Sequence, residues 1–306
     1  MKKITQIFGV CVLLCSLLSG CEKEESSAPY EIIGSDVSYT DNATPFPYEV
    51  CGIKITKSAE RVVSLSPAVT EILSELGFSD KIVGISDYCD YPENLNAKRV
   101  GSSENPDIDA ILKLAPDALF TLSPLSERET YTLSQANIAV LNLSAPTSID
   151  GYAAMYSEIA GAFYGRETIG EKEQRRTDKV SSDAVNNLES AAEKVSLETF
   201  VYVTEKLTLA GVGTFENAVL SLAGENLCEP EGYVSAESCS GIFPKYIIAD
   251  DNLSLNTIRT NSVLKAMTDN GAKVCFVSSQ YLERPTLRTA EMFARLAEQS
   301  DRVTSE

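Results

Sequence analysis

The sequence of 306 residues contains no histidine and no tryptophan. Without histidine, the chain cannot build a Ser-His-Asp triad, a Cys-His pair, a histidine-ligated haem or the two-histidine zinc helix of metalloproteases. It also lacks the glycine-rich loops that hold nucleotide phosphates and the GxSxG turn of α/β-hydrolases. These absences exclude the most common enzyme chemistries, so we predict that the protein is not an enzyme.

Basic side chains are scarce as well. The chain has 26 lysines and arginines against 44 acidic residues, a formal net charge of −18. A surface this acidic repels phosphate backbones, so we predict no nucleic-acid partner. The apolar fraction of 43% is typical of a folded globular protein, and the length suffices for two domains.

Residues 1–20 have the pattern of a signal peptide. Lys2 and Lys3 precede an apolar run from Ile7 to Leu18, which is shorter than the roughly 20 residues of a membrane span. The sequence Leu18-Ser19-Gly20-Cys21 resembles the lipobox of bacterial lipoproteins, and this resemblance implies that Cys21 is lipidated. The alternative is an ordinary signal peptide followed by a cysteine by coincidence.

The charged and small residues that follow predict a lipidated tether and lead-in over residues 21–44. We therefore expect an extracytoplasmic protein, lipid-anchored to the outer face of the bacterial cell membrane.

The remaining cysteines form no obvious framework. Their number is odd and no CxxC pair occurs, so neither a zinc site nor a set of disulfides is indicated. Buried free thiols are favoured for most of them, while one bridge, between Cys228 and Cys239, stays open in an exported protein. The five are Cys51, Cys89, Cys228, Cys239 and Cys275.

Residues 45–148 alternate between strand and helix patterns. The predicted strands are 61–65, 82–85, 118–122 and 140–143, and a helical face over residues 108–115 ends at Pro116. Ser66 and Pro67 are typical of a helix start, and Gly77 predicts the end of that helix. This alternation indicates a mostly parallel sheet covered on both faces.

The rest of the chain predicts a helical connection and a second lobe. Residues 149–196 begin with a helical face and become charged and poor in apolar residues, which predicts a long exposed helix between two lobes. Residues 197–306 repeat the first pattern, with strands 200–203, 246–249 and 274–277 and a helix after Thr214 that ends at Gly224. The predicted fold class is α/β, with two Rossmann-like lobes whose mostly parallel sheets are joined by a single long helix.

Each predicted lobe carries one acidic residue in the first turn of an equivalent helix. These residues are Asp109, after Pro106, and Glu237, before Pro244. Carboxylates suit helix N-termini in general, so this pattern alone allows two exposed carboxylates with no partner.

Five segments resemble, in chain order, those of the substrate-binding proteins of cobalamin and iron-siderophore ABC importers. The second of them is similar to the cobalamin-binding branch, and the resemblance covers roughly residues 45–299. The segments are 61–72 (RVVSLSPAVTEI), 86–92 (SDYCDYP), 105–117 (NPDIDAILKLAPD), 211–215 (GVGTF) with 223–226 (AGEN), and 283–285 (ERP) with Arg288.

The resemblance implies a monomeric, bilobed protein that holds its ligand between the lobes and delivers it to an ABC permease dimer with its ATPase subunits. In this family one acidic residue on each lobe meets arginines of the permease, and Asp109 and Glu237 occupy those positions. The protein is expected to carry no cofactor or metal of its own, because the corrinoid or ferric chelate is cargo.

The expected ligand-binding residues are Ser66, Tyr88, Tyr91, Tyr233 and Arg284. The tyrosines offer rings to a flat macrocycle, Ser66 offers a polar group at a helix start, and Arg284 suits a carboxylate or phosphate. Roles other than ligand binding stay open for three of them: turn packing for Tyr91, core packing for Tyr233 and an ion pair for Arg284.

The ligand itself also stays open. Relatives that bind cobalamin commonly use tryptophans, which this chain lacks, so cobalamin, other corrinoids and ferric chelates are all retained. Haem is disfavoured without histidine, although tyrosine or methionine ligation is not excluded. The alternative function is a lipoprotein enzyme or a metal-cluster or haem-binding protein on the same scaffold, using Cys89 or Cys239.

Overall fold

The computed structural model describes residues 44–165 and 171–303. All of them belong to one compact unit, Asn42–Glu306. The predicted signal peptide and Cys21 lie outside the described residues, as does the tether up to residue 43. In the part of the chain that is described, no helix combines the length and the apolar character that a membrane span requires.

The first sheet is parallel throughout, where a mostly parallel sheet was predicted. Its strand order is β5-β4-β3-β6-β7. The central strand, β3, has all three of its residues buried, as expected for a parallel sheet that is covered on both faces. A separate antiparallel pair, β1 and β2, precedes it and was not predicted. The bounds are β1 Tyr48–Val50, β2 Ile53–Ile55, β3 Val62–Ser64, β4 Ile82–Ile85, β5 Lys98–Arg99, β6 Ala118–Thr121 and β7 Ala139–Asn142.

Local signals set the helices of this half. Ser66 caps α1 by accepting a hydrogen bond from the Val69 N–H, and Gly77 follows the helix with a φ of +86°, so both predicted ends of the helix are confirmed. A capping box between Ser126 and Glu129 starts α3, a helix that was not predicted. The helices are α1 Pro67–Glu75, η1 Ser79–Lys81, α2 Ile108–Leu114 and α3 Glu127–Gln135.

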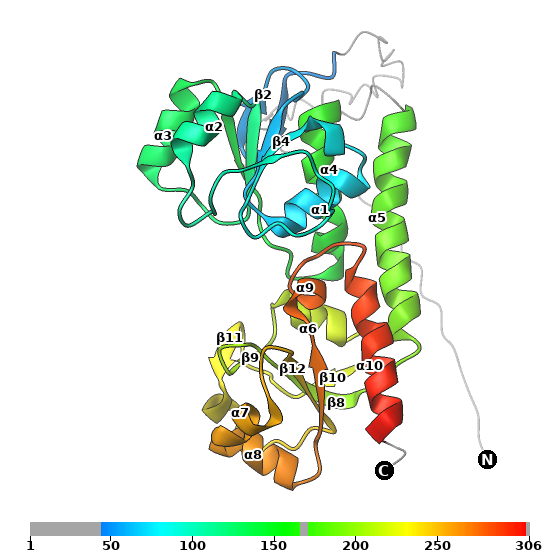
Figure 1. Cartoon of the computed structure of the whole chain (residues 1–306). Coiled ribbons are helices and arrows are strands. Elements are labelled where there is room, and N and C mark those ends of the chain that lie inside the picture. Colours follow the sequence, from blue (N-terminus) through cyan, green and yellow to red (C-terminus); the bar gives the residue numbers. More distant parts are fainter. Residues whose placement is uncertain (1–43, 166–170, 304–306) are drawn as a thin grey trace, which may run out of the picture. The chain divides into compact units, whose positions relative to one another are not determined.

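The connection between the sheets contains two helices, α4 (Ile149–Tyr164) and α5 (Glu171–Ala192), where a single long helix was predicted. They lie side by side and contact each other (Figure 1). α4 contacts α1 and β1 of the first half and also α6 of the second, while α5 contacts α10. The two helices therefore join both halves of the described structure.

The second sheet is mixed. Its order is β11-β9-β8-β12-β13, with β10 paired to β8; the pairs among β8, β10, β12 and β13 are parallel, and β9 and β11 are antiparallel. Gly224 begins β10 instead of ending the preceding helix, which corrects the prediction. The strands are β8 Glu198–Val203, β9 Thr208–Ala210, β10 Gly224–Asn226, β11 Tyr233–Ser235, β12 Tyr246–Asp250 and β13 Lys273–Val277.

The helices of the second half correct one further expectation. The segment that carries Glu237 is the short 3₁₀-helix η2, and it is not equivalent to α2. Glu237 still lies in its first turn. The helices are α6 Phe215–Leu220, η2 Ala236–Cys239, α7 Leu255–Thr260, α8 Ser262–Asp269, α9 Ser279–Leu282 and α10 Thr289–Val303.

A single large apolar cluster spans both halves. It includes Phe120 of β6, Tyr152 of α4 and Phe200 of β8, all of them fully buried. Phe78 stacks on Phe163 of α4 with ring centroids 3.9 Å apart. Burial of one such side chain contributes roughly 1.5–3 kcal/mol, so this shared core holds the two sheets together through α4. The α/β class with two lobes is thus confirmed.

The five cysteines within the described residues are free thiols. Cys89, Cys228, Cys239 and Cys275 are buried, as favoured from the sequence, and Cys51 is half-buried. The sulfur atoms of Cys228 and Cys239 lie 3.2 Å apart as a thiol–thiol contact.

Candidate functional site

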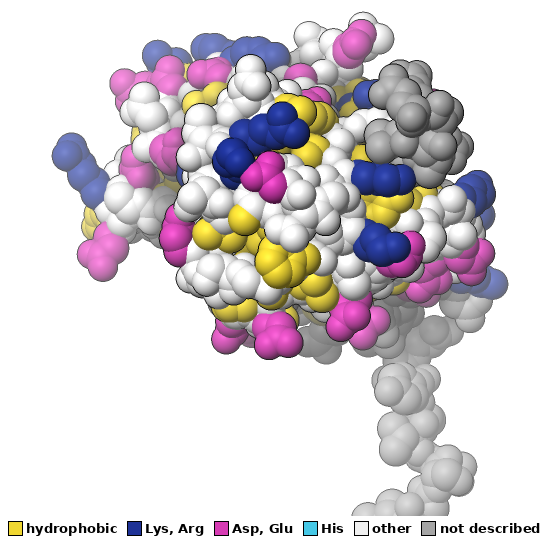
Figure 2. All heavy atoms as spheres, turned by 90° about the horizontal axis from the view of Figure 1, so that it is seen from below, with side chains coloured by type: hydrophobic (Ala, Val, Ile, Leu, Met, Phe, Trp, Pro, Cys, Tyr) yellow, Lys and Arg dark blue, Asp and Glu magenta, His cyan; other side chains and the backbone are white. Residues whose placement is uncertain are grey.

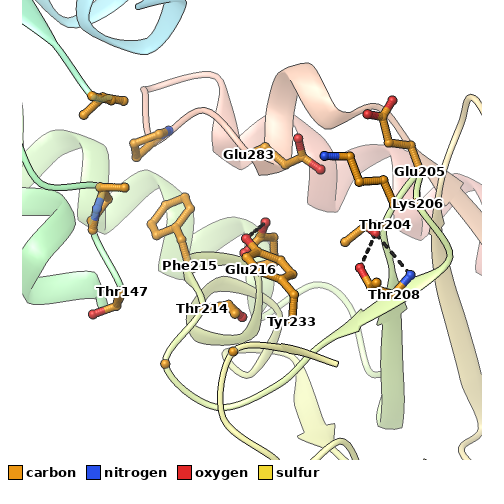
Figure 3. A pocket seen from close by; sticks show the side chains of 16 residues that line it. Thr147, Thr204, Glu205, Lys206, Thr208, Thr214, Phe215, Glu216, Tyr233 and Glu283 are labelled. Atoms are coloured by element: carbon orange, nitrogen blue, oxygen red, sulfur yellow. Dashed lines mark hydrogen bonds between the residues drawn. The ribbon is translucent and has the colours of Figure 1, made fainter. Parts of the chain in front are cut away.

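A cavity of about 570 Å³ lies between the two halves (Figure 3). This volume is in the range of small-molecule sites. The first half contributes residues that follow the carboxyl ends of β6 and β7, where ligands bind in parallel sheets: Leu122, Ala145, Pro146 and Thr147. The second half contributes Thr204, Glu205, Lys206, Thr208, Gly213, Thr214, Phe215, Glu216, Gly232, Tyr233, Glu283 and Pro285.

The turn after β8 presents charged side chains to the cavity. The hydroxyl groups of Thr204 and Thr208 lie 2.7 Å apart, and the Thr204 Oγ1 accepts the Thr208 N–H at 3.3 Å (Figure 3). Leu207, between them, has a φ of +59°, a left-handed backbone that closes the turn. Glu205 and Lys206 therefore project from a turn that side-chain hydrogen bonds fix.

The start of α6 forms the adjacent wall. Thr214 caps the helix by accepting the Asn217 N–H at 3.2 Å, and its own hydroxyl donates to the Gly211 carbonyl at 2.8 Å. A side chain at Gly211 would meet the Pro230 carbonyl oxygen at 1.8 Å, so only glycine fits there. This tight entry brings Phe215 and Glu216 to the cavity.

Glu216 is a buried carboxyl group at this wall, only 3% exposed. Its Oε1 accepts a hydrogen bond from the Tyr233 hydroxyl at 2.6 Å, whereas its Oε2 is buried without a hydrogen-bond partner in the described structure. Burial raises the pKa of Glu216 because it disfavours the charged form. The wall thus carries unused hydrogen-bond acceptor capacity.

Glu283 lines the same cavity and keeps contact with solvent. Partial desolvation, together with the negative charges of Glu216 and Asp250, raises the pKa of Glu283 to about 7. Its Oε1 also accepts a weak hydrogen bond from the Tyr202 hydroxyl at 3.4 Å. Asp250, whose charge acts on Glu283, is fully buried and has one oxygen unpartnered in the described structure.

This raised pKa predicts a pH dependence of stability. The Glu283 carboxyl holds its proton more tightly in the folded protein than in the unfolded chain, where its pKa is near 4.5. Protonated Glu283 therefore contributes fully to the free energy of unfolding below about pH 4.5, and this contribution is lost as the pH rises through about 7. When the pH is raised from about 5 to about 8, the free energy of unfolding is expected to fall further for the wild type than for the Glu283→Gln variant. Urea titrations at the two pH values measure this difference. Equal losses in the two proteins would contradict the prediction.

Of the five predicted ligand residues, Tyr233 lines the cavity. Ser66 is 6% exposed, and its side chain caps α1. Tyr88, 65% exposed, and Tyr91, 42% exposed, lie in the loop after β4 and do not line the cavity. The Tyr91 ring lies under the Arg288 guanidinium, with 4.5 Å between the carbon and the ring centroid.

Arg284 also lies outside the cavity lining and is ion-paired. Its Nη1 lies 3.2 Å from Glu71 Oε1 and 2.5 Å from Asp90 Oδ1. The Gln280 amide donates to Asp90 Oδ2 at 2.9 Å. These contacts join the segment around α9 to α1 and the β4 loop, so Arg284 connects the two halves in this structure.

The two residues predicted to dock on a permease are both exposed. Asp109 lies in the first turn of α2. Glu237 accepts a hydrogen bond from the Asn261 amide at 3.1 Å, and hydrogen bonds from its own backbone N–H, Ser235 and Asn261 lower the pKa of Glu237. Both carboxylates are therefore accessible to a partner.

The net acidic charge does not by itself describe the cavity. Figure 2 shows the end of the molecule that carries α7 and α8, with hydrophobic side chains near the middle of the face and acidic ones mostly along its border. The charges of the cavity come instead from its own lining, which has three acidic residues and one basic residue in the described structure. No group of three or more histidine, cysteine or acidic side chains is arranged for a metal within the described residues.

Sequence reasoning missed Phe215, Glu216 and Glu283 as cavity residues. The Thr214 cap placed Phe215 and Glu216 in a first helical turn, and Glu283 belongs to the last family-like segment. None of these local signals shows that the three side chains face one cavity, because that requires the packing of α6 against α9.

Residues 62–241 match the family model described as "Periplasmic binding protein". The vitamin B12-binding protein of Vibrio cholerae is 28% identical over 264 residues, which cover 81% of this chain and 88% of that protein. A protein of Bacillus subtilis named an uncharacterized ABC transporter substrate-binding lipoprotein is 21% identical over 277 residues, 84% of each chain.

A solved structure shares the fold. The periplasmic vitamin B12 binding protein of Vibrio cholerae superposes with a TM-score of 0.61 at 22% identity, covering 81% of this chain and 99% of that one. The family model covers more than half of the chain, and the structure shows the two-lobed α/β architecture that the sequence segments implied. The chain belongs to the periplasmic binding protein family.

Proposed function

We propose that the protein is the substrate-binding lipoprotein of an ABC importer, which captures a corrinoid or a ferric chelate and delivers it unchanged to a membrane permease. The cavity that both halves line carries this proposal, because a ligand held there contacts both lobes at once. The Vibrio cholerae relatives, both named for vitamin B12 binding, favour a corrinoid as the ligand.

The delivery step rests on surface carboxylates. Asp109 and Glu237 are exposed, one in each half, and suit arginines on the two subunits of a permease dimer. Exposed ion pairs contribute only about 0.2–1 kcal/mol each, so these residues would orient the complex and speed encounter. Lipidation of Cys21 would keep the protein at the membrane, and the lipoprotein name of the Bacillus subtilis relative supports this anchor.

Ligand titration tests the proposal. The purified mature protein is titrated with cyanocobalamin and with ferric siderophores, with tyrosine emission and ligand absorbance as readouts, and the recovered ligand is analysed by mass spectrometry. Saturable binding with an unchanged ligand mass is expected. Absence of binding to every corrinoid and every ferric chelate, or chemical conversion of a bound ligand, would refute the proposed function.

Tyr88 offers a separate test of how the ligand is held. Its ring is 65% exposed and follows β4, so we propose that it packs against the ligand once the ligand is bound. The Tyr88→Ala variant is expected to bind a corrinoid about three- to tenfold more weakly, since ring stacking is worth about 0.5–1.5 kcal/mol. Tyr131→Ala is the matched control, because Tyr131 of α3 is equally exposed and does not line the cavity. Equal affinities of the two variants would assign Tyr88 no role in binding.

A further inference from the structure

The cavity wall formed by α6, β11 and α9 is rich in hydrogen-bond acceptors. It carries Glu216 and Glu283, and Tyr233 donates its hydroxyl proton to Glu216 Oε1 at 2.6 Å (Figure 3). That bond uses the Tyr233 donor within the protein, so it is not free for a ligand. The wall therefore offers a ligand mainly carboxyl oxygens.

One carboxyl oxygen of Glu216 lacks a hydrogen-bond donor within the described residues. The residue is only 3% exposed, and its Oε2 has no hydrogen-bond partner in the described structure. An unpaired buried acceptor destabilises the folded state, so native proteins usually supply a donor. Because Glu216 lines the cavity, a bound ligand is in a position to supply that donor.

The charged groups around Glu216 also favour a ligand that donates a hydrogen bond. Glu283 lines the same cavity, and the buried Asp250, which acts electrostatically on Glu283, has an unpartnered oxygen of its own in the described structure. Lys206 is the one basic residue of the described lining; it is exposed and forms no ion pair with either carboxylate in the described structure. An N–H donor or a cation at this wall would stabilise the charged forms of Glu216 and Glu283, which burial disfavours, whereas a ligand carboxylate would be repelled by those charged forms.

We propose that Glu216 and Glu283 form a carboxylate subsite that binds an N–H group of the ligand, a primary amide or an ammonium, and that excludes a carboxylate at the same place. This inference rests on the proposed function and narrows its ligand class. Corrinoids carry primary amides around the macrocycle, and ferric trihydroxamates can carry an ammonium group. Ferric tricatecholates are anionic throughout and do not fit.

Matched ligand pairs test the subsite. The wild-type mature protein is titrated with cyanocobalamin and with its monocarboxylates, in which one peripheral amide is hydrolysed, and with an ammonium-bearing ferric trihydroxamate against a ferric tricatecholate. At least one monocarboxylate is expected to bind about tenfold or more weakly than cyanocobalamin, since a like charge replaces a donor. For chelates, the trihydroxamate is expected to bind more tightly than the tricatecholate.

Variants connect this discrimination to the two carboxyl groups. The Glu216→Gln, Glu283→Gln double variant is expected to bind the amide and carboxylate forms within about threefold of each other, because the negative charge is gone. Glu193→Gln, an exposed residue after α5, removes the same kind of charge away from the cavity and is expected to retain the wild-type discrimination. Circular dichroism checks that the double variant is folded. The comparison of ligands on the wild-type protein tests the subsite independently of any variant.

The outcomes separate this inference from the proposed function. Binding of every monocarboxylate as tightly as cyanocobalamin, or of the tricatecholate as tightly as the trihydroxamate, would overturn the subsite and leave the importer function standing. Unchanged discrimination in a folded double variant would also overturn the subsite. Failure of every corrinoid and ferric chelate to bind would overturn both.

Discussion

Replacement of Glu71 by alanine is expected to lower the free energy of unfolding by about 3–5 kcal/mol, the usual loss when one partner of a buried charge network is removed. The Glu71 side chain is fully buried in α1. It accepts hydrogen bonds from Thr286 at 3.0 Å, Arg284 at 3.2 Å and Arg288 at 3.4 Å. All three donors come from the segment after α9, so the variant also weakens the contact between the two halves.

Urea denaturation followed by circular dichroism measures this loss, with Glu60→Ala as the control. Glu60 is also ion-paired, to Lys81, but its side chain is 65% exposed. Such surface pairs are typically worth about 0–1 kcal/mol, so the control is expected to remain close to the wild type. Similar destabilisation of both variants would show that burial of Glu71 does not determine its contribution.

The double variant Asp109→Ala, Glu237→Ala is expected to reduce uptake about tenfold in cells that depend on the proposed importer, while the Kd for the ligand stays unchanged. Loss of charge complementarity at an exposed interface mainly slows encounter and misorients the complex. Both residues are exposed, and neither lines the cavity, so ligand capture does not involve them. Uptake of labelled ligand, together with titration of the purified variant, separates the two effects.

The control for docking is Glu127→Ala with Glu189→Ala. Glu127 begins α3 and Glu189 lies on α5; both are exposed, and the pair removes the same total charge. Normal uptake is expected for this variant. A comparable defect in both double variants would mean that net charge, and not the positions of Asp109 and Glu237, governs delivery.

Local sequence signals were sufficient where a short segment determines its own structure. α1 is an example, because Ser66, Pro67 and Gly77 fix its ends, and its apolar face follows the helical period. The β-branched strands β3 and β12 were also predicted, since buried parallel strands are almost continuously apolar. The strands β9 and β11 were missed because, unlike β3, they are not buried along their whole length and carry no run of β-branched residues.

The contacts that define the site were beyond this kind of reasoning. Arg284 suited a ligand carboxylate in the sequence, yet it meets Glu71 and Asp90, which lie about two hundred residues earlier in the chain. Nothing in a local window shows which acid an arginine will reach. Glu216 falls within the helix predicted after Thr214, but its place at the cavity depends on the packing of Tyr233 from β11.

The apolar cluster shared by both sheets limits how the molecule can open. Separating Phe120, Tyr152 and Phe200 would create voids in a densely packed interior, and no ordinary thermal motion offsets that cost. The polar contacts of Asp90 with Gln280 and Arg284 are different, because water can replace them at little cost. We therefore expect the two halves to open only by a slight hinge movement on the Asp90 side, with α4 held in place by the apolar cluster that both sheets share.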